Sequence, residues 1–360
     1  MWRQWIAASG YLSVLVLPML LVVGVAIDKP YLAFGVAMLV FPLARGVFGR
    51  YAGPTVWREG IATALHWLPV LYGAVLAAAL VLLLSQIANG ALTTTGQWIG
   101  LGLSLWMVLL FATCPAHDLI HRRSGPQARV GHLIAGLAGY PLLSFEHLRH
   151  HARPGETSKA EAPRVDESVW HFAWRRIASI AVMVLRNNAA KRRQSRIPIR
   201  RRSTNEALLL CTIAWAAFAA TGGVAGFLTY LAAIIGVTVG IQIITYLQHW
   251  GLGDDNLADA ARGQYAWEND CLFEAWVTLH INFHQSHHRK AHLPFYRLPM
   301  TSDSPRLPAG YVVLMILCLF PRLWQQLMLP VLAHWKQQPQ QPRSVGRRLS
   351  CFNFYGPGVD

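Results

Sequence analysis

Charged residues are scarce in this sequence, and long stretches contain none. Asp, Glu, Lys and Arg make up 14% of the 360 residues, and 54% of the residues are hydrophobic; about 25% charged is usual for soluble domains. The four uncharged stretches are residues 5–27, 30–44, 61–116 and 207–253. Because a helix needs about 20 apolar residues to cross the hydrocarbon core, the first two stretches each fit one span and the last two fit two spans each. We therefore predict a polytopic membrane protein with six transmembrane helices.

Turn signals divide the two longer stretches. One lies near Asn89–Gly96 and the other at Thr221-Gly222-Gly223. The first uncharged stretch is too long for the apolar part of a signal peptide, and its flank, Met1–Gln4, carries a single Arg. We expect this stretch to be retained as the first helix.

Cysteine pairs are also missing. None of the five cysteines forms a Cys-x-x-Cys motif; they are Cys114, Cys211, Cys271, Cys318 and Cys351. This spacing predicts no zinc ribbon, no disulfide framework and no fused rubredoxin or ferredoxin.

Positive charge is nearly absent from alternate loops. Of the 32 Lys and Arg residues, 17 lie between Arg122 and Arg202 and ten lie beyond residue 248, whereas only Lys29 falls in a loop assigned to the outside. This pattern predicts a protein of the inner (cytoplasmic) membrane with both termini in the cytoplasm. A basic cytoplasmic face suits anionic lipids and an acidic protein partner. The placement of the charge, with no aromatic–basic platform, argues against nucleic acid despite the net charge of +15.

Shorter apolar segments predict helices on the cytoplasmic side. Val130–Phe145, interrupted by a glycine and a proline, and Leu307–Pro321 are expected to lie in the interface, and Ile177–Leu185 to form another surface helix. The expected fold is all-α: a membrane domain over residues 1–336 with a histidine-rich helical cap in the cytoplasm. Residues 337–360 are Gln/Pro/Arg-rich and are predicted to be disordered.

Nine of the 15 histidines fall into a pattern at the cytoplasmic ends of the predicted spans. Residues three or four apart share one face of a helix, so the spacings H-x-x-x-H and H-x-x-H-H should aim two or three imidazoles at one point. Spans four and six both return to the side of the N-terminus, so all nine side chains can converge without crossing the bilayer. The nine candidate metal ligands are His117, His121, His147, His150, His151, His249, His284, His287 and His288.

Nine imidazoles exceed the four to six ligands of one first-row metal ion, so two ions are expected. Three of the patterned segments are called histidine boxes below: His117–His121, His147–His151 and His284–His288. Structural zinc would prefer a closed four-ligand site, and no cysteine lies in these boxes, so iron is favoured over zinc. A lone histidine is more often an interfacial or hydrogen-bonded residue than a ligand. That interpretation covers the remaining histidines, of which His280 and His292 are the best further candidates: His66, His132, His171, His280, His292 and His334.

The residues around these histidines resemble a known family. The resemblance is carried by H-D-L-I-H-R from His117, E-H-L-R-H-H from Glu146, Y-L-Q-H-W-G-L from Tyr246 and N-F-H-Q-S-H-H from Asn282. These segments look like the membrane fatty acid desaturase superfamily and are most similar to its alkane 1-monooxygenase and xylene monooxygenase branch. The resemblance covers most of residues 60–335 and includes a similar C-terminal segment, Leu307–Trp324.

This resemblance implies a cytoplasmic diiron site in which the nine histidines are ligands, with O2 as co-substrate. The electrons would come from a separate rubredoxin, ferredoxin or reductase. The expected reaction is hydroxylation of an unactivated C–H bond in a hydrophobic substrate that enters from the bilayer, such as an alkane, a fatty acyl chain or an alkyl-aromatic compound. Desaturation at the same type of site is the main alternative, and a metal transporter is a weaker one.

The chain also departs from the family pattern. Asp118 stands where Glu is usual, the second box is one residue shorter than the alkane hydroxylase form, and Gln248 replaces a Glu before His249. These differences affect the choice of substrate rather than the histidines. Five carboxylates are candidates to orient the ligand rings by accepting the second ring N–H: Asp118, Glu146, Glu268, Asp270 and Glu274.

Overall fold

The structure is a computed structural model that describes residues 2–51, 56–122, 125–191, 199–253, 264–301 and 303–337. Within these ranges every extended regular element is a helix, and pairing between extended segments is limited to two isolated bridges, Arg50–Cys271 and Glu268–Arg306. The all-α prediction is confirmed.

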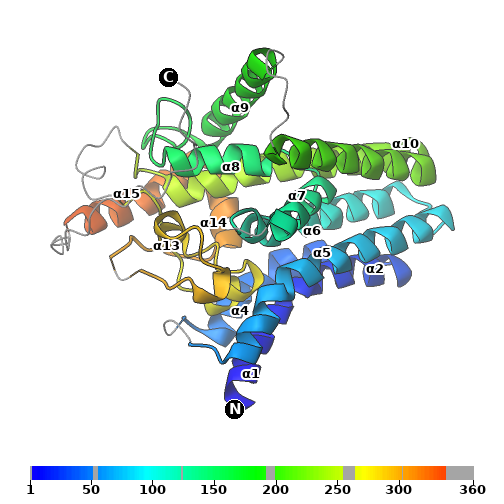
Figure 1. Cartoon of the computed structure of the whole chain (residues 1–360), viewed down its shortest axis with the longest axis horizontal. Helices are drawn as coiled ribbons and strands as arrows, with labels where there is room; N and C mark the ends of the chain where they lie inside the picture. The colour runs from blue at the N-terminus through cyan, green and yellow to red at the C-terminus, as the bar shows by residue number, and fades with distance from the viewer. Residues whose placement is uncertain are drawn as a thin grey trace.

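Four helices are long and apolar enough to cross a membrane by length and composition: Trp2–Ala26, Glu59–Ala88, Thr95–Ile120 and Ser203–His249. The first consists of α1 (Trp2–Ser9), a 3-10 segment η1 (Gly10–Leu15) and α2 (Val16–Ala26); the others are α5 (Glu59–Ala88), α6 (Thr95–Ile120) and most of α10 (Ile199–His249). A shorter apolar helix, Leu32–Phe48, is built from α3 (Leu32–Gly35), a π-helical segment η2 (Val36–Val40) and α4 (Phe41–Phe48). Figure 1 shows α2, α5, α6 and α10 extending together to one side of the molecule.

The helix α10 folds back on itself at Gly223, whose backbone angles (φ 58°, ψ −142°) are not helical. The rings of Phe218 and Tyr230 stack with their centroids 4.9 Å apart, whereas residues 12 apart along a straight helix would be separated by about 18 Å. The indole N–H of Trp215 donates to the carbonyl of Phe227 across the same bend. The turn therefore lies where the sequence predicts it.

The four long helices, with α10 folding into two halves, and the short Leu32–Phe48 helix correspond to the six predicted apolar segments. That each of them crosses a membrane stays a prediction. The turn between α5 and α6 is short because Gly90 adopts a positive φ of 77° and a capping box between Thr94 and Gln97 begins α6.

Close contacts at two glycines place α7 (Gly125–Leu137) against the long helices. A Cβ on Gly131 would come within 2.9 Å of the Ala116 carbonyl in α6, and one on Gly136 within 2.5 Å of the Ala207 carbonyl in α10. The chain then turns at Gly139, with φ 73°, and α8 (Leu143–Ala152) begins. The predicted interruption within Val130–Phe145 is therefore present.

The remaining helices form a cap at one end of the long helices (Figure 1). Ile177–Leu185 lies within α9, as predicted for a helix, and Leu307–Pro321 contains α14. Residues 338–360 of the predicted disordered tail lie outside the described residues. Together with α8, the cap elements are α9 (Val169–Lys191), α12 (Leu272–Val277), α13 (His284–Arg289), η3 (Phe295–Arg297), α14 (Tyr311–Cys318) and α15 (Pro321–Gln337).

Candidate metal centre

The nine patterned histidines meet where the ends of α6 and α10 reach the cap helices α8 and α13. They separate into two groups, and within each group one nitrogen from every ring lies within 4.8 Å of the others. The five-histidine cluster consists of His117, His121, His147, His151 and His287. The four-histidine cluster consists of His150, His249, His284 and His288.

The ring nitrogens face one another at short distances in both clusters. In the five-histidine cluster, the Nε2 atom of His147 lies 2.7 Å from that of His117 and 2.8 Å from that of His151. In the four-histidine cluster, the Nε2 atom of His249 lies 2.9 Å from that of His150 and 3.0 Å from that of His284. Ligands bonded at about 2.0–2.1 Å to one ion lie about 3 Å apart when they are at right angles. Both clusters have that spacing.

The hydrogen-bonding capacity of His249 tests whether its cluster fits a cation. Its Nδ1 lies 2.6 Å from the carbonyl oxygen of Tyr265, which can only accept a hydrogen bond. In a neutral ring Nδ1 therefore carries the proton and Nε2 presents a lone pair. That lone pair points at the Nε2 atoms of two further histidines, and a metal ion is the group that stabilises such convergent lone pairs. The donor set fits a metal ion.

Each three-histidine box divides between the two clusters. In α8, His147 and His151 belong to the five-histidine cluster and His150 to the other; in α13, His284 and His288 belong to the four-histidine cluster and His287 to the other. Residues four apart on a helix differ by about 40° in direction, but adjacent residues differ by about 100°. Each of these boxes therefore aims two imidazoles at one point, within the expected two or three, and its third imidazole lies in the other cluster.

Burial keeps the cluster histidines of the cap in the neutral form. It lowers their pKa values well below the usual range, and the neighbouring imidazoles lower them further, as for His147, where His117 and His121 contribute. Neutral imidazole is the form that binds metal. The cap residues affected are His147, His150, His151, His284, His287 and His288.

A buried charge network supports the four-histidine cluster. Glu161 lies 3.5 Å from Nδ1 of His150 and pairs with Arg176 at 2.8 Å and with Arg149 at 3.1 Å. Arg176, from α9, also pairs with Glu146 at 2.9 Å, and its side chain is only 3% exposed. Glu161 is not among the carboxylates singled out in the sequence. Its position shortly after the second box is the signal that could have identified it.

Two of the predicted carboxylates hold the ends of ligand-bearing helices. Asp118 pairs with Arg122 at 2.6 Å and accepts the backbone N–H of Phe295 at 2.9 Å. Glu146 accepts the hydroxyl of Tyr140 as well as the guanidinium of Arg176.

The other three predicted carboxylates anchor the loops around α12 and α13. Glu268 accepts the backbone N–H of Ser286, inside α13, at 2.8 Å. Asp270 pairs with Arg45 at 2.7 Å. Glu274 accepts the backbone N–H of Tyr311 at 2.7 Å, and burial raises its pKa to about 7. The proposal that any of the five carboxylates orients a ligand ring stays a prediction.

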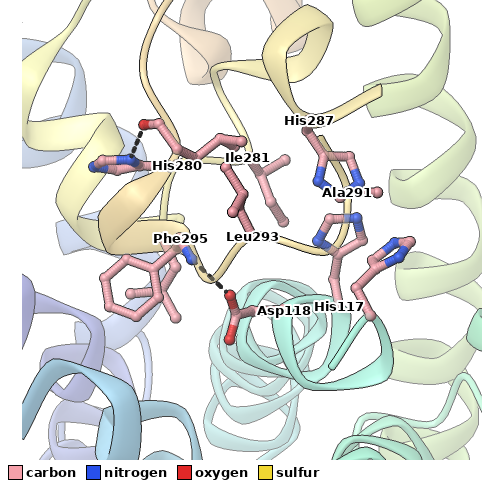
Figure 2. A pocket seen from close by; sticks show the side chains of 11 residues that line it. His117, Asp118, His280, Ile281, His287, Ala291, Leu293 and Phe295 are labelled. Atoms are coloured by element: carbon pink, nitrogen blue, oxygen red, sulfur yellow. Dashed lines mark hydrogen bonds between the residues drawn. The ribbon is translucent and has the colours of Figure 1, made fainter. Parts of the chain in front are cut away.

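A cavity with room for about one water molecule lies beside the five-histidine cluster (Figure 2). Its lining includes three rings of the cluster together with His280, Asp118 and apolar side chains; the three rings are His117, His121 and His287. His280 is buried but belongs to neither cluster, whereas His292 is exposed. The cavity gives the five-histidine cluster an open side.

Comparison with known proteins supports this interpretation of the site. Residues 93–317, more than half of the chain, match the family model "Fatty acid desaturase". The chain is 28% identical to alkane 1-monooxygenase 1 of Pseudomonas aeruginosa, over 83% of this chain and 82% of that protein. It is 25% identical to alkane 1-monooxygenase 2 of Alcanivorax borkumensis, over 65% of this chain and 63% of that protein. It is 24% identical to the xylene/toluene monooxygenase hydroxylase component of Pseudomonas putida, over 72% of each chain.

Proposed function

We propose that this chain, which belongs to the fatty acid desaturase family, is a membrane-bound non-haem diiron monooxygenase that hydroxylates an unactivated C–H bond of a hydrophobic substrate. The observation that carries this proposal is the pair of histidine clusters, whose nine rings come from four separate segments. The similarity to alkane and xylene monooxygenases supports the class of reaction. Two iron ions, one in each cluster, account for the number of ligands better than a single ion.

The chain's own residues determine where the reaction occurs. Bound iron would supply the activation of O2, for which electrons and protons must be delivered. The nine histidines would hold the two ions without adding negatively charged ligands to the site. Burial of the ligand rings limits access of water, and the small cavity lined by His117, His121 and His287 admits a molecule the size of water or O2.

Placement of the ligands at helix ends supports a substrate that arrives from the bilayer. His117 lies in the last turn of α6, and His249 ends α10; both helices are apolar along most of their length. A C–H bond presented along these helices would meet the metal centre at the membrane surface. A metal transporter would be expected to hold its ligands near the bilayer midplane instead.

The electron donor is proposed to be a separate protein, such as a rubredoxin, ferredoxin or reductase. Within the part of the chain that the structure describes, the four cysteines are free and none is paired with another. The positive charge of the sequence favours an acidic donor.

We also propose that the domain spanning residues 1–336 crosses the inner membrane six times, with the cap and both termini in the cytoplasm. The distribution of Lys and Arg supports this orientation. Single cysteines introduced at Asn89 and at His292, in a background without the native cysteines, would test it. A membrane-impermeant thiol reagent added to intact cells should label N89C but not H292C; the opposite pattern would invert the topology.

The deciding experiment is product analysis with 18O2. Purified protein in nanodiscs, loaded with iron and supplied with a donor protein and its reductase, should convert an alkane, an alkyl-aromatic compound or a fatty acyl substrate to an alcohol that carries 18O. An alkene without the label would establish the desaturase alternative, which the family model also supports. Stoichiometric zinc with no iron in protein from cells, or full activity without metal, would contradict the proposal.

A further inference from the structure

We propose that Tyr11 and His280 form a redox-active pair that draws an oxidising equivalent away from the metal centre when no substrate is bound. The protective role of this pair rests on the proposed function, because it requires oxygen chemistry at the metal centre. The two residues lie outside both histidine clusters, and the proposed reaction does not use them.

The hydrogen bonds of His280 fix its role in the pair. Its Nδ1 lies 3.1 Å from the carbonyl oxygen of Leu298 and must carry a proton to make that hydrogen bond. In a neutral ring Nε2 is then an acceptor. The hydroxyl of Tyr11 lies 2.6 Å from this Nε2 and therefore donates to it. The phenol proton thus already points at a base that can receive it.

The pair joins two parts of the chain that are 269 residues apart. Tyr11 lies in η1, and its neighbour Gly10 allows a close approach to α12, because a Cβ at that position would come within 2.3 Å of the Trp276 ring. His280 and the residue before it, Leu279, have positive φ angles of 61° and 52°. Such angles are costly for residues other than glycine and are often found at functional sites. The fold therefore holds His280 in place despite an unfavourable backbone conformation.

The pair lies between the metal centre and the surface. On one side, His280 lines the same small cavity as His117 and His287 (Figure 2). On the other side, the ring of Tyr11 lies 6.2 Å from that of Trp57, centroid to centroid. Trp57 is only half-buried, and its indole N–H donates to the carbonyl of Tyr296. Aromatic groups that can be oxidised therefore lead from the cavity to the outside.

The proposed step transfers one electron and one proton. The oxidant is the metal centre after oxidation by O2, left without a C–H bond to attack. Tyr11 gives it one electron, and the phenol proton moves to Nε2 of His280, which leaves a neutral tyrosyl radical and an imidazolium. A reductant in solution, such as a thiol, or the electron donor protein then returns one electron by way of Trp57, and the proton moves back to the phenolate oxygen.

Two other buried tyrosines, Tyr246 and Tyr140, lack such a proton acceptor. The hydroxyl of Tyr246 donates to the carbonyl of Glu167 at 2.7 Å, and a carbonyl oxygen cannot accept the proton at moderate pH. Tyr140 donates to the carboxylate of Glu146, but that carboxylate already pairs with the buried Arg176. Protonating Glu146 would leave the arginine with less compensation for its charge. Tyr246 and Tyr140 therefore provide matched comparisons for Tyr11.

The test uses the full chain in nanodiscs with zinc in both clusters, because zinc is redox-inactive and removes the iron chemistry from the measurement. A ruthenium photo-oxidant would generate radicals, followed by transient absorption and electron paramagnetic resonance. The wild type and Y246F should give a neutral tyrosyl radical that Y11F loses. H280Q keeps a hydrogen-bond acceptor that is not basic, so it should also lose the neutral radical.

A radical that survives in Y11F, or that disappears in Y140F instead, would overturn the assignment, as would an unchanged signal in H280Q. Zinc content and the circular dichroism spectrum would show that each variant is folded. In iron-loaded protein with reductant and O2 but no substrate, Y11F should inactivate faster than Y246F; equal rates would show that the pair does not protect the centre. Because the zinc experiment requires no monooxygenase activity, failure of the proposed function and failure of the redox pair give different results.

Discussion

The two histidine clusters share α8 and α13, but α6 completes the five-histidine cluster and α10 completes the four-histidine cluster, and the two differ in what surrounds them. In the four-histidine cluster, two rings have a polar group at Nδ1. The carbonyl of Tyr265 lies next to Nδ1 of His249, and Glu161, which pairs with Arg176, faces Nδ1 of His150. The five-histidine cluster has a small cavity on one side, lined by three of its rings.

This difference suggests a division of roles. A metal ion in the four-histidine cluster would be held by His249, whose Nδ1 is oriented by the carbonyl of Tyr265, and would lie near the negative charge of Glu161, which favours tight binding. A metal ion in the five-histidine cluster would be the one that small molecules reach first. The following predictions would break or sharpen this comparison.

Removing one ligand from each cluster should have the largest effect. H287A should disable the five-histidine cluster and H249A the four-histidine cluster, so each variant should bind about one iron per chain instead of two and lose its activity. Metal analysis and product formation would measure both effects. H292Q, which changes an exposed histidine, is the control. Two irons retained in either ligand variant would break the assignment of two separate sites.

Replacing the buried Arg176, which lies beside the four-histidine cluster, should lower the stability of the folded protein. R176M leaves Glu146 and Glu161 without their shared cation, and removing one partner of a buried ion pair costs about 3–5 kcal/mol. The free energy of unfolding, or the midpoint of thermal unfolding in nanodiscs, would report the loss. R129M removes an arginine that is 58% exposed, and should cost no more than about 1 kcal/mol. Equal effects of the two variants would argue against a role for burial.

Removing the charge of Glu161 should change the metal affinity of one cluster and not that of the other. We expect E161Q to weaken metal binding about 10- to 100-fold in the four-histidine cluster and to leave the other cluster nearly unchanged, since only His150 faces this carboxylate. Competition with a chelator would give the two affinities. E156Q changes a neighbouring acidic residue that pairs with Lys159, and should leave both affinities unchanged. An equal loss at both sites would contradict the proposed division.

Acidification should lower the stability of the chain through both clusters. The loss for each histidine should be smaller than the effects of the substitutions above. Their cap histidines have lowered pKa values in the folded chain, so the unfolded chain binds more protons once the pH falls below about 6.5. The stability that the neutral rings contribute is complete above that pH and is lost as the pH falls toward the folded-state pKa values, by up to about 1.4 kcal/mol per histidine and pH unit.

Thermal unfolding of the metal-free chain between pH 7.5 and 5.5 would measure the pH effect. A smaller slope in H284Q or H151Q would assign part of it to one cluster. A flat profile for the wild type would contradict the lowered pKa values.

Local patterns in the sequence predicted much of the architecture. Uncharged stretches gave the long helices because each helix must expose apolar side chains along its whole length. The turn at Gly223 followed from a local glycine signal, which the backbone angles confirm. The roles of the charged residues were harder to predict because their partners are distant: Arg176 meets two glutamates at positions 146 and 161, and Asp118 meets the backbone of Phe295.

The sequence by itself selected nine of the 15 histidines as candidate metal ligands, because the spacing of residues i and i+4 on a helix is a local property. Only the tertiary structure divided them into five and four, since the partner of each ring lies on another helix and adjacent histidines point about 100° apart. It also removed His280 from the candidate ligands and placed it against Tyr11, across a distance of 269 residues that no spacing rule spans.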